Sequence, residues 1–317
     1  MQMGRVISKK IALALGAGGA RGLAHIGILE EIERSGIKID YVAGSSIGAM
    51  IGALYCLYGN AGDVRRHLAE FLTDEELQKK WDSFVPCHKN ENGKRKVHLL
   101  EELRGFINRQ YVRLAVMTKK SLAREDDLMD PLEQIFEDKT TDDLKIPFSA
   151  CSVDLISGNE LYLNSGKLSE LVYCSSAIPG IFPPCKKGDL LLADGSISDL
   201  VPVDAVPDHD EYIIIAVNFG PGTFLRTNLD SGLDILMRAD ELARIKLNKM
   251  ILEEADLVIS PDVSNFHWAE FSRYEEIIEI GRQAASNAHE DIMAFAETGQ
   301  VKIKPWYKRA FGWLSGA

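Results

Sequence analysis

The chain has 317 residues, of which 46% are hydrophobic and 26% are charged. This composition is ordinary for a folded globular protein and excludes a disordered or fibrous one, and the length allows one large domain or two small ones. The formal net charge of −11 argues against a surface that binds nucleic acid over most of its area. Two regions depart from this acidic balance: residues 79–124 hold 12 basic and 4 acidic residues, and residues 301–317 hold 4 basic residues and no acid. These basic regions predict local, peripheral contact with an anionic membrane surface.

The cysteines and apolar segments bear on the cellular compartment. Five cysteines without a CxxC spacing favour a reducing compartment and argue against a disulfide framework or a zinc site. The apolar run that begins after Lys9 breaks at Gly16, so we expect a short buried strand there and no signal peptide. No segment reaches the roughly 18 uninterrupted apolar residues of a membrane span. We therefore expect a cytoplasmic protein that contacts the inner membrane surface peripherally.

Along the chain, short apolar runs alternate with segments of helical periodicity, which predicts an α/β sandwich with a largely parallel sheet. Gly36 stands where a glycine that ends a helix is expected. The predicted strands are 10–15, 41–43, 148–153, 190–193, 212–217 and 257–259, and the predicted helices are 23–34, 47–57, 63–72, 233–254 and 274–296.

Two regions stand apart from this alternation, so we expect one domain over residues 1–300 with an insertion, followed by a tail. The insertion, residues 81–125, contains an amphipathic stretch with apolar side chains between Leu99 and Ile107. It is either a partly helical cap or lid, or a surface helix packed by its apolar stripe. The basic, aromatic tail, residues 301–317, is typical of an interfacial segment, with a docked or frayed terminus as the alternative.

The sequence Gly44-Ser45-Ser46-Ile47-Gly48 lies between a predicted strand and a predicted helix. A G-x-S-x-G sequence in this setting is typical of a nucleophile elbow, in which the serine sits on a strained turn and is exposed above the sheet. Side chains at Gly44 or Gly48 would collide with the neighbouring strand and helix, and the helix would direct its positive end at Ser46. The alternative is a structural turn rich in glycine and serine.

A second glycine-rich segment follows the first predicted strand and includes Gly16, Gly18, Gly19 and Gly22. Its backbone N–H groups, at a helix N-terminus, could hold either a phosphate or the oxyanion of an acyl-transfer transition state. A dinucleotide fold needs an acidic residue at the C-terminal end of the second strand, but Asp40 precedes that strand. The oxyanion hole is therefore the preferred interpretation.

A serine hydroxyl needs a base to act as a nucleophile at neutral pH. Asp194-Gly195 follows the apolar run 190–193, which puts a carboxylate at a strand end before a flexible turn. The alternative is an ordinary Asp-Gly turn, which is a common hairpin signal.

Four blocks together resemble the patatin-like phospholipases, and more closely their bacterial members related to the catalytic domain of neuropathy target esterase. The resemblance covers residues 11–203. Ala17 stands where the family normally has glycine, and Ser196 where glycine or alanine is usual. The blocks are the oxyanion segment Ala17-Gly18-Gly19-Ala20-Arg21-Gly22, the elbow Gly44–Gly48, the segment Ser175–Pro184, and Asp194-Gly195.

The resemblance implies a three-layer α/β/α sandwich and a serine acyl hydrolase of the lipase, phospholipase or lysophospholipase type. Ser46 would be the nucleophile and Asp194 its base, and the amides of Gly18, Gly19 and Ile47 would stabilise the oxyanion of an acyl-enzyme mechanism. The substrate would be an acyl lipid or another ester, with neither a metal nor another cofactor required. The sequence leaves a homo-oligomeric state open.

The residues leave two alternatives to a Ser-Asp hydrolase open. Ser46, Asp194 and His267 have the chain order of an α/β-hydrolase triad, although His267 between Phe266 and Trp268 is more typical of a packed or surface histidine. His25 is expected to be structural. The chain could instead be a catalytically silent module that binds lipid or membranes through its basic regions and aromatic tail.

Overall fold

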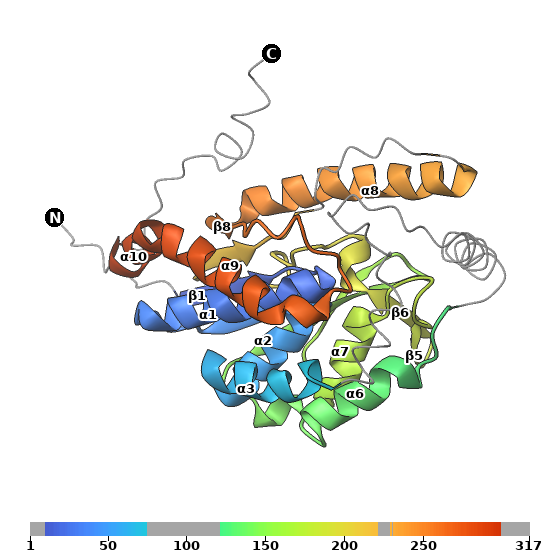
Figure 1. The fold of residues 1–317 in the computed structure, drawn as a ribbon, viewed down its shortest axis with the longest axis horizontal. Coiled ribbons are helices and arrows are strands. Elements are labelled where there is room, and N and C mark those ends of the chain that lie inside the picture. Colours follow the sequence, from blue (N-terminus) through green and yellow to red (C-terminus); the bar gives the residue numbers. More distant parts are fainter. Residues whose placement is uncertain (1–9, 75–120, 221–228, 230, 299–317) are drawn as a thin grey trace, which may run out of the picture.

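The computed structural model describes residues 10–74, 121–220, 229 and 231–298. Within them, an eight-stranded mixed sheet forms the centre of the molecule (Figure 1). Five strands are parallel, in the order β3-β2-β1-β7-β8. β4 and β6 pair antiparallel with β3, and β5 pairs antiparallel with β6. The strands are β1 (Lys10–Leu15), β2 (Tyr41–Ser45), β3 (Phe148–Asp154), β4 (Glu160–Leu163), β5 (Cys185–Lys187), β6 (Leu190–Asp194), β7 (Tyr212–Val217) and β8 (Leu257–Ile259).

The described helices connect these strands. Most are short, and α8 is the longest at 20 residues. They are α1 (Ala24–Arg34), α2 (Ile47–Tyr58), α3 (Ala61–Leu72), α6 (Asp126–Phe136), α7 (Leu168–Ser176), α8 (Gly232–Ile251), α9 (Tyr274–Asn287) and α10 (His289–Thr298).

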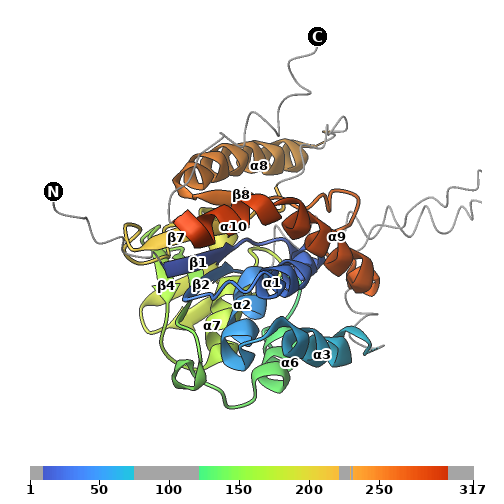
Figure 2. The ribbon, with the colours of Figure 1, turned by 90° about the vertical axis from the view of Figure 1, so that its left-hand side faces the viewer.

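Strands β1, β2 and β7 are buried at every residue except Lys10 because both of their faces are covered, as is usual for parallel sheets. One face packs against α1, α2, α7 and α9 and receives Leu13 and Leu15 of β1. The other face receives Ala12 and Ala14 and is covered by the loop 201–206 and by the C-terminal end of α8. Figure 2 shows α1 and α2 against one side of the strands and α8 at the top of the molecule. The α/β fold class predicted from the sequence is confirmed.

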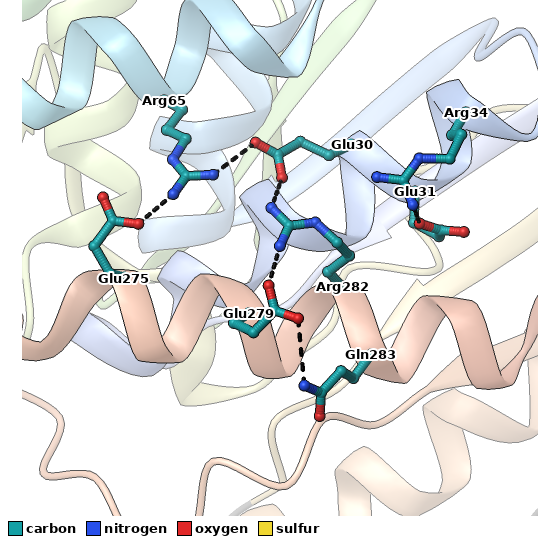
Figure 3. A network of polar contacts seen from close by, with 8 residues as sticks. All are labelled: Glu30, Glu31, Arg34, Arg65, Glu275, Glu279, Arg282 and Gln283. Atoms are coloured by element: carbon teal, nitrogen blue, oxygen red, sulfur yellow. Dashed lines mark hydrogen bonds and ion pairs between the residues drawn. The ribbon is translucent and has the colours of Figure 1, made fainter.

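Helices α1 and α9 approach so closely that a glycine stands at the contact on each side. A Cβ atom at Gly27 would lie 1.9 Å from the carbonyl oxygen of Ile278, and one at Gly281 would lie 2.0 Å from that of Ala24. An ion-pair network closes the outer rim of this contact (Figure 3): Glu30 of α1 binds both Arg65 of α3 and Arg282 of α9. Helix α1, which follows the first strand, is thus held against α9 near the end of the described chain.

Most of the predicted elements are present, with differences at short or interrupted segments. Gly36 has φ +73° directly after the helix-capping residue Ser35, as expected of a glycine that ends a helix. The predicted helix 274–296 is broken at Ala288 into α9 and α10. Strands β4 and β5 and helices α6 and α7 are additions to the predicted set.

Two further sequence predictions meet the structure only in part. A disulfide joins Cys174 of α7 to Cys185 of β5, with Cα atoms 5.2 Å apart, so the argument against disulfides is wrong for this pair. Of the proposed cap or lid insertion, only 121–125 lies within the described residues, where the Leu122 and Ala123 amides bond to the segment after α7. The tail 301–317 lies outside the described residues.

Candidate active site

The segment Gly44–Gly48 forms a sharp strand-to-helix turn. Strand β2 ends at Ser45, α2 begins at Ile47, and Ser46 between them has φ 55° and ψ −121°. A positive φ is costly for a residue with a side chain and marks stored strain at functional positions. The turn also requires its glycines, because a Cβ at Gly44 would lie 2.4 Å from the Gly48 carbonyl oxygen and one at Gly48 only 2.1 Å from that of Leu15. The elbow predicted from the sequence therefore has the expected geometry.

The backbone around Ser46 is fixed from a second element. The Ser46 amide donates a hydrogen bond to the buried Ser175 hydroxyl of α7 at 3.0 Å. Ser46 is also the residue that precedes α2, and the Ile47 amide in the first turn of that helix has no acceptor within the described part of the chain. The partial positive charge of a helix N-terminus therefore lies beside the Ser46 hydroxyl.

The glycine-rich segment after β1 is tethered to two distant parts of the chain. The Gly16 amide donates to the Val217 carbonyl at the end of β7, at 3.1 Å, and the Ala17 amide donates to the Leu200 carbonyl in the loop after Asp194, at 2.9 Å. Neither the Gly18 amide nor the Gly19 amide has an acceptor among the described residues. These two N–H groups are therefore available to a ligand.

Close packing sets this segment against the elbow. A Cβ at Gly22 would lie 2.2 Å from the Ile47 side chain, and one at Gly18 would lie 2.9 Å from the Phe219 ring. Gly19 has φ +58° and faces the Trp268 carbonyl, which also accepts the Ala20 amide at 2.6 Å. Since the Gly22–Ile47 contact joins the two segments directly, the glycine-rich segment and the elbow form one continuous structure.

Arg21 and His25 brace the same segment from its helical side. The Arg21 guanidinium donates to the Gly18 carbonyl at 3.4 Å, and burial lowers the pKa of Arg21 while nearby Glu241 raises it. His25 is fully buried, and its Nε2 bonds to the Gly16 carbonyl oxygen at 2.9 Å. Burial lowers the pKa of His25 to about 4, so the ring is neutral at physiological pH and Nε2 is the donor. The structural role expected for His25 thus has a defined partner.

Asp194 is the last residue of β6, which pairs antiparallel with β3. Ser45 lies opposite Cys151 and Asp194 lies opposite Ser152, so Ser46 and Asp194 stand at neighbouring levels on either side of β3. The glycine that follows Asp194 packs on the Cys151 backbone, where a Cβ would lie 2.6 Å from the carbonyl oxygen. The sheet therefore brings the two side chains to the same rim.

The Asp194 carboxyl is fully buried, and its two oxygens differ. Oδ1 accepts the Ser196 amide at 2.8 Å, whereas Oδ2 has no hydrogen-bond partner within the described part of the chain. Burial raises the pKa of Asp194 above its ordinary value, and interaction with the Ser46 side chain lowers it in part. In enzymes that use such a pair, the hydrogen bond between the hydroxyl and the carboxyl is often long before substrate binds.

His267 lies in the loop that follows β8, next to the glycine-rich segment. Its Nδ1 accepts the Ala269 amide at 3.3 Å, and its own amide donates to Glu270 at 3.0 Å. In a serine triad the histidine Nδ1–H donates to the aspartate, which is the opposite hydrogen-bond role for that nitrogen. The arrangement of His267 therefore favours a local structural function.

Several residues that hold the site together have no recognisable chemical motif. Ser175 fixes the Ser46 amide, the Leu200 carbonyl fixes Ala17, and the Trp268 carbonyl fixes Ala20. Two of these contacts use backbone carbonyls, which every residue type has. Ser175 lies in the segment 175–184 that contributed to the family resemblance, and this is the one sequence signal that pointed to it.

Within the residues described here, no group of three or more His, Cys, Asp or Glu side chains is arranged to hold a metal ion. No described helix is both long and apolar enough to cross a membrane. The residues assembled at the rim are those that acyl transfer uses: a hydroxyl, a carboxyl and free backbone amides.

Comparison with known proteins extends this picture. An uncharacterized NTE family protein of Mycobacterium tuberculosis is 27% identical over 308 residues, which cover 90% of this chain and 47% of the relative. The mouse patatin-like phospholipase domain-containing protein 6 is 28% identical over 223 residues, covering 69% of this chain and 14% of that protein. The chain thus spans less than half the length of either relative.

Among solved structures, VipD from Legionella pneumophila aligns with a TM-score of 0.48 and 12% identity, covering 89% of this chain and 67% of that one. The family model described as patatin-like phospholipase matches residues 13–207, which include the glycine-rich segment, the elbow and Asp194. As this match spans more than half of the sequence, the chain belongs to the patatin-like phospholipase family.

Proposed function

We propose that the chain is a serine hydrolase of acyl lipids or related carboxylic esters, with Ser46 as nucleophile and Asp194 as general base. One observation carries the proposal: a serine on a strained elbow lies across β3 from a buried carboxyl whose pKa the serine lowers and whose Oδ2 bonds to none of the described residues. Membership in the patatin-like phospholipase family supports a lipid ester as the substrate class.

In the proposed reaction, Asp194 accepts the Ser46 proton as the hydroxyl oxygen attacks the ester carbonyl carbon. The amides of Gly18, Gly19 and Ile47 stabilise the negative charge on the carbonyl oxygen. The tetrahedral intermediate expels the alcohol, which takes the proton from Asp194, and an acyl-enzyme remains. Water then repeats these steps with the same base and releases the fatty acid. Burial supports the role of Asp194, because a raised pKa makes the carboxylate a stronger base than an exposed aspartate.

Labelling with a fluorophosphonate tests the nucleophile. We expect the wild-type chain to be labelled and Ser46→Ala to lose both labelling and ester hydrolysis. Ser45→Ala is the matched control, because Ser45 is the buried neighbour and its hydroxyl forms no hydrogen bond with the residues that the structure describes. Equal labelling of Ser46→Ala and wild type would refute the assignment, and a wild-type chain that is not labelled would support the silent lipid-binding module.

The base is tested separately from the nucleophile. Asp194→Asn keeps the size of the side chain but cannot accept the proton, so we expect kcat to fall by about 10² to 10⁴. His267→Ala should leave hydrolysis nearly intact, since Nδ1 of His267 already accepts a local amide. A loss beyond about 100-fold in His267→Ala would instead favour a Ser-His-Asp triad.

The finer properties remain predictions. They are the boundaries of a 1–300 domain, a cap or lid at 81–125, cytoplasmic location and a homo-oligomeric state. Peripheral contact of the basic regions with an anionic membrane is also a prediction, since both regions lie almost entirely outside the described residues. A hydrolysis panel of phospholipids, lysophospholipids, triglycerides and small esters, with Ser46→Ala as the blank, would identify the substrate.

A further inference from the structure

Helix α8 exposes large apolar side chains along one side. Leu236 is 67% exposed and Met250 58%, and only Asn248 of the described side chains in this helix is buried. In Figures 1 and 2, α8 lies at the top of the coloured ribbon, with the sheet and the other helices on one side of it only. Five of these exposed residues share one arc of the helix, whereas Met237, 57% exposed, lies on the other side. We name the five the apolar face of α8: Ile235, Leu236, Leu242, Leu247 and Met250.

The opposite side of α8 is directed toward the candidate active site. The Asn248 side chain donates a hydrogen bond to the Asn218 side chain at 3.2 Å. Asn218 directly follows Val217, the last residue of β7, whose carbonyl accepts the Gly16 amide. Arg244 is close enough to Asp194 to lower the pKa of that carboxyl, and Glu241 raises the pKa of Arg21. Because a helix with its side chains is about 10 Å across, anything that covers the C-terminal half of the apolar face lies about one helix diameter from the end of β7, which holds the glycine-rich segment.

The charge on this side of the helix indicates which kind of partner covers it. At 100° per residue, Lys246 falls within the apolar face and Lys249 at its border, and both are exposed. No acidic residue of α8 falls within this arc, although Asp240, which forms an ion pair with Arg244, lies at the border opposite Lys249. In the core of a protein–protein interface Lys246 would need an acidic partner, and lysine is depleted there. At a lipid surface, its ammonium extends to the phosphates while neighbouring apolar side chains enter the acyl region.

We propose that the apolar face of α8 docks the protein on an anionic lipid surface and so places the active site next to that surface. The choice of a lipid partner depends on the proposed function, because an enzyme that hydrolyses lipid esters takes its substrate from such a surface. Contiguous exposed apolar patches of this kind mark protein or membrane contacts. Lys246 within the face favours a membrane over a protein as the partner.

The test compares two double variants of the full chain, each in an otherwise wild-type and in a Ser46→Ala background. Leu236→Glu with Leu242→Glu puts two charges into the face, and Gln283→Glu with Asn287→Glu puts the same two charges on the exposed side of α9. Binding is measured by sedimentation with equimolar phosphatidylcholine–phosphatidylglycerol vesicles. We expect at least a tenfold loss of binding for the α8 variant only, since a buried leucine side chain contributes well over one factor of ten.

Hydrolysis of a soluble p-nitrophenyl ester provides the second measurement and should stay within about twofold of wild type in both variants. Lys246→Gln should weaken binding to the anionic vesicles severalfold while binding to pure phosphatidylcholine is unchanged. Wild-type binding by the α8 variant overturns the docking proposal. So does a wild-type dimer in light scattering that becomes monomeric in this variant. Vesicle binding is measured without catalysis. If the wild-type chain bound vesicles through α8 but hydrolysed no ester, the proposed function would be refuted and the docking proposal would stand.

Discussion

Asp199 is a buried residue between Asp194 and Leu200, whose carbonyl accepts the Ala17 amide of the glycine-rich segment. Among residues 10–74, 121–220, 229 and 231–298, no group forms a hydrogen bond with its Oδ1, and its Oδ2 is 3.8 Å from the Cys151 sulfur. Burial raises the pKa of Asp199 to about 8, helped by the negative charges of Glu160 and Asp204, although hydrogen bonds from Cys151 and Tyr162 lower it in part. The carboxyl is therefore mostly protonated in the folded protein at neutral pH.

This shift has a definite sign for stability. An unfolded aspartate titrates near pH 3.9, so between pH 4 and 8 the folded state binds a proton that the unfolded state has lost. The contribution of Asp199 to the free energy of unfolding therefore falls by about 1.4 kcal/mol per pH unit across this window. Asp199→Asn resembles the protonated acid and does not titrate. We expect the variant to gain stability relative to wild type as the pH rises, by on the order of 4 kcal/mol between pH 5 and 8.

Urea denaturation of both proteins, followed by circular dichroism at a series of pH values, measures this difference. All other groups titrate in both proteins, so they cancel when the two free energies are subtracted. Asp138→Asn is the matched control, because it makes the same change of side chain at a fully exposed position. A flat difference for Asp199→Asn over the same range would refute the reasoning.

Other substitutions test the packing around the site. Gly48→Ala should reduce hydrolysis by more than about tenfold and lower the melting temperature, because the new Cβ would lie 2.1 Å from the Leu15 carbonyl oxygen and α2 would have to move; a variant with wild-type kcat would contradict this. His25→Phe should lower kcat about tenfold with little change in KM, since it removes the 2.9 Å bond to Gly16; equal changes in both constants would argue against a positioning role. Glu30→Gln weakens a carboxylate shared by two guanidiniums and should cost about 1–2 kcal/mol in thermal unfolding; an unchanged melting temperature would show that the network contributes nothing.

The sequence was sufficient for the parts of the fold that depend on local pattern. Strand β1 and helix α2 could be predicted because their apolar residues are continuous or periodic and because glycines bound them. Strand β5 has three residues and partly exposed side chains, so it carries no period that could be recognised. Helix α6 contains Pro131, which is unusual inside a helix and argues against predicting one there. The disulfide depends on the proximity of α7 and β5, which no spacing of cysteines along the chain encodes.

The sequence motifs pointed to the residues of the candidate site but not to how the fold brings them together, and Asp194 shows why. The rule that strand ends meet at one edge applies to parallel strands, whereas β6 is antiparallel to β3. Asp194 reaches the rim because β6 pairs with only the last three residues of β3, Ser152 to Asp154. If β6 paired along all of β3, Asp194 would lie at the opposite edge, several residues of about 3.3 Å each from Ser46.

That short register is fixed by contacts outside the sheet pattern. The Asp194 amide donates to the Ala177 carbonyl after α7 at 3.1 Å, and the Ser152 hydroxyl lies 2.7 Å from the Ala193 carbonyl oxygen and 3.0 Å from that of Cys174. The same helix provides Ser175, which holds the Ser46 amide. Helix α7 thus positions both proposed catalytic residues through hydrogen bonds at its C-terminal end. Since a change in this helix would move Ser46 and Asp194 together, the distance between them is better protected than either residue's position in the sheet.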